Sequence, residues 1–144
     1  AAQSGQLEMI KTMLYYGATN VNTAMREASF LGSIDCVNLL VKYGANNFNE
    51  CLVSACWKGG RDIAELMISR GANNFNECLP YACRTGRQNI AELMISLGAT
   101  DFNSGFSKAC QYERHSIMYL LFVKCVIPCR WCNKDAISHI FYYG

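Results

Sequence analysis

The sequence predicts an all-α solenoid, a row of stacked helix–turn–helix units, on two observations. Glycines at positions 17, 44, 71 and 98 open four segments that are each 27 residues long. Segments 44–70 and 71–97 are also nearly identical, because they agree at 19 of 27 positions. Internal repeats with a period of this size are the signature of stacked supersecondary units. Helices this short are marginal alone in water, so each unit needs its neighbours to bury its apolar face.

The unit at 44–70 contains two short helical patterns. The first covers about residues 49–58, with Asn49 as the expected N-cap, and a Gly-Gly pair then breaks the chain. The second covers about residues 62–69 and is followed by Gly71, a residue suited to the left-handed conformation that ends many helices. Each unit is therefore predicted to be a pair of helices with two or three turns each.

Pro80 interrupts the first helical pattern of the next unit. Counted from Asn76 as the N-cap, Pro80 lies at the fourth helical position, where proline begins to remove a hydrogen bond. The sequence therefore predicts either a later helix start than in the preceding unit or a distorted first turn.

The period also divides the chain, whose 144 residues fit a single repeat domain over 1–144. Residues 1–5 correspond to residues 55–59 of the later unit, so the chain begins within a repeat and is expected to be a fragment of a longer protein. The predicted segments are a partial repeat at 1–16, full repeats at 17–43, 44–70, 71–97 and 98–124, and a C-terminal cap at 125–144.

The second half of each unit resembles the ankyrin repeat. The run A-C-x-x-G-x-x-D-I-A-E-L-M-I-x-x-G-A at 55–72 is similar to the ankyrin pattern A-A-x-x-G-H-x-x-V-V-x-L-L-L-x-x-G-A. Leu52 takes the place of the leucine in the ankyrin T-P-L-H motif, which is otherwise absent. An ankyrin repeat has about 33 residues, so about six residues of the finger between repeats are missing. The slot of Leu52 is shared by Met25, Leu79 and Phe106.

The resemblance implies an ankyrin-like solenoid with shortened inter-repeat loops, each reduced to a tight turn such as Asn46–Asn49. Arrays of short, Asn-rich repeats of this kind further resemble the ankyrin-like proteins of giant DNA viruses. Such a protein is expected in the cytoplasm of the host cell or in the virion.

The nine cysteines follow the same period. Free cysteine behaves as a small buried hydrophobe, the residue type that ankyrin repeats place in these slots. Equivalent slots of stacked repeats lie about 10 Å apart, which is beyond the reach of a disulfide. The alternative, a disulfide framework, requires an oxidising compartment. We therefore predict reduced thiols and an intracellular protein. One slot holds Cys56, Cys83 and Cys110, and another holds Cys51 and Cys78.

The differences between the two near-identical units are concentrated on one face of the first helix and on the turn after it. In ankyrin proteins this face lines the surface that binds partners, and Trp, Tyr and Arg are the preferred hot-spot residues of interfaces. We therefore predict a protein–protein interaction module. The alternative is surface drift where packing imposes no constraint, with Trp57 covering its neighbour. The predicted partner-binding residues are Phe30, Trp57, Lys58, Tyr81, Arg84, Arg87 and Tyr112.

A basic band accompanies these residues, but acidic residues are interspersed and the net charge is only +2. This balance argues against nucleic-acid binding and favours a protein partner with an acidic patch. The longest apolar stretch, at 117–123, is too short to span a membrane. A second hypothesis is a structural or assembly component, for example of a virion, that packs through the solenoid faces. The band consists of Lys58, Arg61, Arg84, Arg87, Lys108 and Arg114.

The segment 125–144 contains the one candidate metal site. Cys129 and Cys132 have the spacing of a metal knuckle, with Cys125 before them and His139 after them, and thiolates with imidazole suit tetrahedral zinc. The viral proteins that the chain resembles have a similar C-x2-C…H tail. Zinc here would be structural. The alternative is a cysteine-rich cap with His139 exposed and no cofactor.

Catalytic arrangements are absent from the sequence. It has no glycine-rich phosphate loop, no Ser/His/Asp constellation and no paired carboxylates at fixed spacing. The sequence therefore predicts a protein that is not an enzyme.

Overall fold

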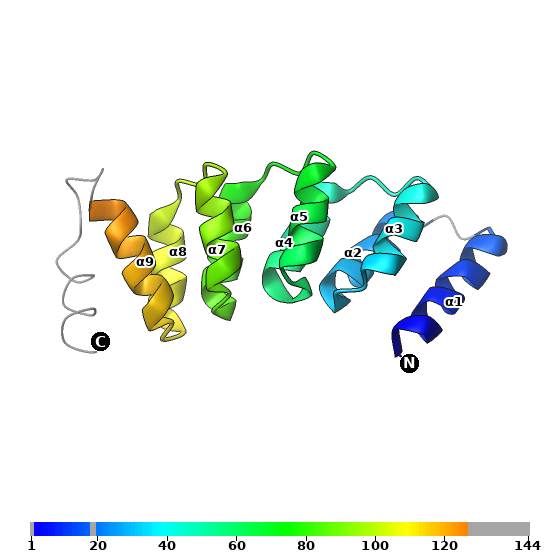
Figure 1. Ribbon diagram of the computed structural model, residues 1–144, viewed down its shortest axis with the longest axis horizontal. Coiled ribbons are helices and arrows are strands. Elements are labelled where there is room, and N and C mark those ends of the chain that lie inside the picture. Colours follow the sequence, from blue (N-terminus) through cyan, green and yellow to red (C-terminus); the bar gives the residue numbers. More distant parts are fainter. Residues whose placement is uncertain (1, 18–19, 127–144) are drawn as a thin grey trace. The chain divides into compact units, whose positions relative to one another are not determined.

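The computed structural model describes residues 2–17 and 20–126, and every regular element in that part of the chain is helical (Figure 1). The chain forms two compact units, Ala1–Asn74 and Phe75–Gly144. The all-α prediction is confirmed. Unit 1 contains α1 (Ala2–Tyr15), α2 (Val21–Leu31), α3 (Ile34–Lys42), α4 (Phe48–Ser54), the π-helical turn η1 (Ala55–Gly59) and α5 (Arg61–Ser69). Unit 2 contains α6 (Phe75–Thr85), α7 (Gln88–Ser96), α8 (Phe102–Gln111) and α9 (His115–Val126).

The helices recur at the interval that the sequence predicts. The first helices of the pairs begin at Val21, Phe48, Phe75 and Phe102, and the second helices begin at Ile34, Arg61, Gln88 and His115. In unit 1, α2 packs against α3 and α4, α4 packs against α5, and α1 contacts α3. In unit 2, α6 packs against α7 and α8, and α9 packs against α8 and α7. None of the helices described here is long and apolar enough to cross a bilayer.

The core is formed by the residues that the repeats share. Met25, Leu52 and Leu79 are completely buried, as predicted, whereas Phe106 in the same slot is only half-buried. Gly105, the residue before Phe106, lets α8 pack closely against α6. A Cβ at Gly105 would lie 3.1 Å from the Sγ of Cys83, so α8 approaches α6 more closely than a side chain at this position allows.

The Gly-Ala pair at each repeat boundary ends the second helix of one repeat and begins the loop to the next. Gly71 has a φ of 104°, and its N–H donates to the carbonyl of Ile68 at 3.0 Å. The N–H of Ala72 donates to the carbonyl of Met67, also at 3.0 Å, which completes a Schellman motif. Glycine supplies the positive φ, and the buried alanine methyl packs into the core. The same bonds form at Gly44–Ala45 and Gly98–Ala99.

The repeated asparagines connect one repeat to the next. Asn49 lies in the first turn of α4, and its Oδ1 accepts a hydrogen bond from the N–H of Asn73 at 2.9 Å. The carbonyl of Asn49 accepts a second bond from the Nδ2 of Asn74 at 3.2 Å. We call this arrangement the asparagine bridge. The equivalent main-chain bonds run from Asn46 to Asn22 at 2.9 Å and from Thr100 to Asn76 at 2.7 Å.

The bridge corrects the prediction that Asn49 is an N-cap. The helix begins at Phe48 with Asn47 at the cap position, so Asn49 is the second helical residue and directs its amide to the next repeat. The sequence could not distinguish these roles, because asparagine is a common residue both at caps and in turns.

One of the two predicted alternatives at Pro80, a later helix start, is wrong. Helices α4 and α6 begin at equivalent positions, and α6 continues through Pro80 to Thr85. Proline cannot donate the hydrogen bond that the carbonyl of Asn76 would accept in a regular helix. Asn76 is exposed, so water is available to that carbonyl.

The cysteines of the described residues are free thiols, and Cys110 is the only one of them that is not fully buried. Burial raises the pKa of the Cys83 thiol to about 12, from an ordinary value of 9.0. Burial also raises the pKa of Cys51 and Cys110. A raised pKa lowers the fraction of thiolate at neutral pH, and the thiolate is the reactive form of cysteine.

The asparagine bridge predicts a stability difference between two asparagines. Asn49→Ala removes the acceptor for the Asn73 N–H, whereas Asn38→Ala changes an exposed residue of α3 that makes no described side-chain hydrogen bond. Because Asn49→Ala also loses this hydrogen bond, we expect it to destabilise the fold by about 1 kcal/mol more than Asn38→Ala does. Urea unfolding of the two variants measures the difference. Equal free energies of unfolding would contradict a structural role for the bridge.

The Cys83 thiol predicts a loss of stability in alkali. Above pH 9.0 the thiol ionises in the unfolded chain but keeps its proton in the folded chain, so its contribution is present below pH 9.0 and decreases as the pH rises towards about 12. Cys83→Ala should therefore reduce the slope of unfolding free energy against pH in this range by up to about 1.4 kcal/mol per pH unit. Urea unfolding between pH 8 and 11 in reductant tests this. Identical slopes would show that Cys83 ionises equally in both states.

Candidate partner-binding face

In unit 1, two aromatic residues of neighbouring repeats form one exposed patch. Phe30, near the end of α2, and Trp57, in η1, occupy equivalent positions and contact each other edge to face, with ring centroids 6.2 Å apart and planes at 79°. The Nζ of Lys58 lies 5.2 Å from the centroid of the Phe30 ring. Trp57 remains 41% exposed. We call these three residues the aromatic patch.

The π-helical turn η1 presents Trp57 and Lys58. In the repeats on either side, the first helix ends one residue earlier, at a left-handed glycine, Gly32 or Gly86. Here Gly59, at the equivalent position, is still helical, and Gly60 takes φ 98° and ψ 173° instead. That conformation is almost restricted to glycine. The predicted break therefore occurs at Gly60 alone, and the Gly-Gly pair permits the longer helix.

In unit 2, an arginine takes the position of Trp57. The Cζ of Arg84, near the end of α6, lies 5.0 Å from the centroid of the Tyr112 ring, which follows α8. The Nε of Arg114 donates a hydrogen bond to the carbonyl of Arg84 at 3.2 Å. Arg114 is exposed, and Tyr112 is 37% exposed. We call Arg84, Tyr112 and Arg114 the arginine–tyrosine patch.

Two backbone features hold Arg114 in this position. Its side chain lies over Gly86, where a Cβ would come within 3.2 Å of the Cδ and Nε of Arg114. The residue before it, Glu113, has a φ of 55°. Glu113 occupies the position of the left-handed glycines Gly32 and Gly86, so a non-glycine residue adopts a conformation that glycine adopts in other repeats.

The structure thus brings together five of the seven predicted binding residues in two groups. Phe30, Trp57 and Lys58 meet in unit 1, and Arg84 meets Tyr112 in unit 2. The other two, Tyr81 on α6 and Arg87 before α7, are half-buried residues of unit 2. The sequence analysis placed Arg114 in the basic band but missed it as a site residue. The period contained the signal, because Arg114 follows Arg87 by 27 residues.

The positions that differ between the two near-identical repeats avoid the core. None of the eight differing positions is buried in segment 44–70 or in segment 71–97. The shared positions include the fully buried Leu52 and Leu79 and the buried cysteines. Substitution has therefore been confined to exposed and half-buried positions, which include Trp57 and Arg84.

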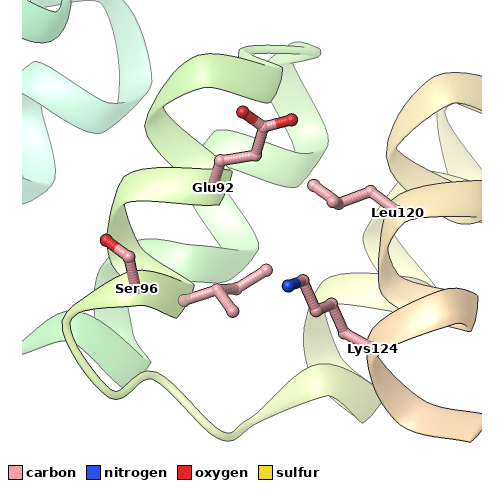
Figure 2. Close-up of a pocket in the computed structure, with 5 residues that line it drawn as sticks. Glu92, Ser96, Leu120 and Lys124 are labelled. Carbon is pink, nitrogen blue, oxygen red and sulfur yellow. The ribbon is translucent and has the colours of Figure 1, made fainter. Parts of the chain in front are cut away.

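A groove lies on the other side of unit 2, between the second helices α7 and α9 (Figure 2). Leu120 and Lys124 of α9 point towards α7, where Glu92, Ile95 and Ser96 form the opposite wall. The groove has a volume of about 400 Å³ and an apolar floor with charged edges. It contains none of the predicted binding residues.

The predicted zinc ligands fall outside what the structure describes. Cys129, Cys132 and His139 lie beyond residue 126, and the side chain of Cys125, at the end of α9, is also outside the described part. Among the residues that are described, no group of three His, Cys, Asp or Glu side chains could hold a metal ion. Zinc binding therefore stays a prediction from the sequence.

The helix pairs and their Gly-Ala turns have a counterpart among known repeat families. The family model described as ankyrin repeats (3 copies) matches residues 1–78. No curated protein matches the chain. Because the family match covers more than half of the 144 residues, the chain belongs to the ankyrin-repeat family.

Proposed function

We propose that this protein is an interaction module that binds a protein partner through the ends of its first helices. Ankyrin repeats are generally protein–protein interaction modules, and the family is typically non-catalytic. The observation that carries the proposal is the contact between Phe30 and Trp57. Equivalent positions of neighbouring repeats hold large aromatic side chains that touch each other, and Trp57 remains 41% exposed.

The aromatic patch has the properties of an interface hot spot. Aromatic side chains bury a large apolar area when a partner covers them, and hot spots are enriched in Trp, Tyr and Arg. The edge-to-face contact and the ammonium of Lys58 over the Phe30 ring restrict these side chains before binding. A restricted side chain loses less conformational entropy when a partner binds, so the binding is stronger for the same contact area.

The charges on the same helix ends support a partner with an acidic surface. Lys58 in unit 1 and Arg84 and Arg114 in unit 2 present positive groups beside aromatic rings. Complementary charge mainly raises the rate of association and the specificity of an interface. The net charge of +2 is too small for the strong basic excess of nucleic-acid binders.

The cysteines support a reducing compartment for this interaction. The core of both units contains free thiols, including Cys51 and Cys56 in unit 1 and Cys78 and Cys83 in unit 2. Disulfides are rare where glutathione and thioredoxin keep thiols reduced, as in the cytosol. An intracellular location is therefore part of the proposal.

Affinity capture from the native source tests the proposed face. Trp57→Ala combined with Arg84→Ala should reduce recovery of the partner by at least about tenfold, because each residue is placed as a hot spot worth 1–2 kcal/mol or more. Tyr119→Ala is the matched control, since Tyr119 is a 64% exposed aromatic residue on the second helix α9. Quantitative mass spectrometry measures the recovery. A partner set that is unchanged in the double variant but lost in the control would place the interface on the second helices.

A second candidate function, self-assembly, is favoured by an exposed apolar pair on α9. Tyr119 is 64% exposed and Val123 is 37% exposed, and their spacing of four residues places them on one face of the helix. If two copies associate through this face, light scattering after size-exclusion chromatography should show a dimer that Tyr119→Glu converts to a monomer. A wild-type monomer at high concentration would eliminate this candidate.

A further inference from the structure

We propose that the arginine–tyrosine patch of unit 2 is a carboxylate-binding site that holds an Asp or Glu side chain of an acidic protein segment. The inference deepens the proposed function and rests on it, because it names the chemistry of the partner at one of the two patches. Three features carry it: the fixed orientation of Arg114, the restriction of Arg84 by Tyr112, and the left-handed conformation of Glu113.

Arg114 is oriented before a ligand arrives. Its Nε donates to the carbonyl of Arg84, so the guanidinium cannot rotate freely. The guanidinium has five N–H donors in one plane, and this bond uses the single donor on Nε. The four donors on the two Nη atoms form the end of the fork that matches a carboxylate. Arg114 is exposed and forms no ion pair with any residue that the structure describes.

Arg84 and Tyr112 form the adjoining side of the site. The guanidinium of Arg84 lies over the Tyr112 ring, and this contact restricts the Arg84 side chain. The backbone carbonyl of Arg84 in turn accepts the hydrogen bond that restricts Arg114. Arginine differs from lysine in this respect, because the planar group stacks on a ring and still binds an oxyanion along its edge. The site therefore combines the guanidinium of Arg114, held on the Arg84 carbonyl, with the guanidinium of Arg84, held on the Tyr112 ring.

The backbone around Arg114 is adapted to this arrangement at a cost. Glu113 adopts a φ of 55°, a strained conformation for a non-glycine residue, at a position where the three preceding full repeats all have glycine. On the facing turn, Gly86 leaves the space that the Arg114 side chain occupies. Strained residues of this kind are concentrated at binding and active sites.

The local charge favours a carboxylate over a phosphate. Glu113 is exposed and directly precedes Arg114, so one negative charge stands beside the two arginines. A carboxylate carries a single negative charge, whereas a phosphorylated side chain carries about −1.5 to −2 at neutral pH and is repelled more strongly by Glu113. A bidentate Arg–carboxylate pair satisfies both ligand oxygens without a higher positive charge.

Fluorescence polarisation of a labelled hexaglutamate peptide with the full chain tests the site at low ionic strength. We expect saturable binding with a Kd of about 1 mM or lower. Arg114→Gln should raise the Kd about tenfold, and Arg114→Lys should restore little of the loss because lysine lacks the planar fork. Lys124→Gln is the charge-matched control, since it removes one positive charge from the exposed face of α9 in the same unit, and should change the Kd by less than about twofold.

A pair of glycine variants tests the geometry without changing the charge. Gly86 and Gly98 are both exposed with positive φ, 78° and 105°, so alanine causes backbone strain at both positions. Only at Gly86 would the new Cβ meet Arg114, because no atom lies within 4 Å of a Cβ at Gly98. Gly86→Ala should therefore raise the Kd severalfold and Gly98→Ala should not. Thermal melts of both variants establish that they are folded at the temperature of the binding measurement.

Three results would overturn the proposal. The first is no saturable binding of hexaglutamate by the wild-type chain. The second is an equal loss of affinity in Arg114→Gln and Lys124→Gln, which would mean that only the net charge matters. The third is at least tenfold tighter binding of a phosphoserine peptide than of its glutamate counterpart. If any of these occurs while Trp57→Ala with Arg84→Ala still abolishes partner capture, the carboxylate site is wrong and the proposed function stands.

Discussion

The hydrogen bonds between successive repeats are the constraint on which the other features depend. A pair of helices with 7 to 12 residues each cannot bury its apolar face alone, and here the loops between the pairs are too short for the long finger of an ordinary ankyrin repeat. In place of a finger, the side-chain amide of an asparagine such as Asn49 connects successive repeats. It accepts a main-chain N–H from the following repeat, and the Gly-Ala turn positions that N–H by ending the preceding helix in a fixed geometry.

The exposed side chains at the end of each first helix can therefore vary from repeat to repeat. The buried positions and the asparagines hold the repeats together, whereas the positions that differ between the two near-identical repeats, such as Trp57 and Arg84, are exposed or half-buried. Two repeats with 19 of 27 identical residues consequently present different chemistry, an indole on a π-helical turn in one and a guanidinium on a regular helix in the other. The side chains at these positions can change without disturbing the core.

Much of the architecture followed from the period, because a repeat of 27 residues fixes the helix starts, the glycine positions and the core slots together. The predictions that were wrong or incomplete concern contacts between residues that are distant in the sequence. Asn49 was interpreted as a cap because its partner is 24 residues away, and the later helix start that was one alternative at Pro80 is wrong because α6 begins at the position equivalent to the start of α4. The π-helical turn could not be predicted from a Gly-Gly pair, since either glycine can end a helix. The period shows that Arg114 is equivalent to Arg87, but only the fold places its side chain on the Arg84 carbonyl.

The asparagine bridge also determines how such an array can change in length. Its donor and acceptor recur at a constant separation, Asn22 with Asn46, Asn49 with Asn73, and Asn76 with Thr100. Duplication or deletion of a complete repeat therefore leaves every remaining bridge closed, whereas one extra residue in a loop would misalign donor and acceptor. Gene duplication of a whole repeat therefore preserves the hydrogen bonds between repeats. The near-identity of segments 44–70 and 71–97 is the pattern that a recent duplication would leave.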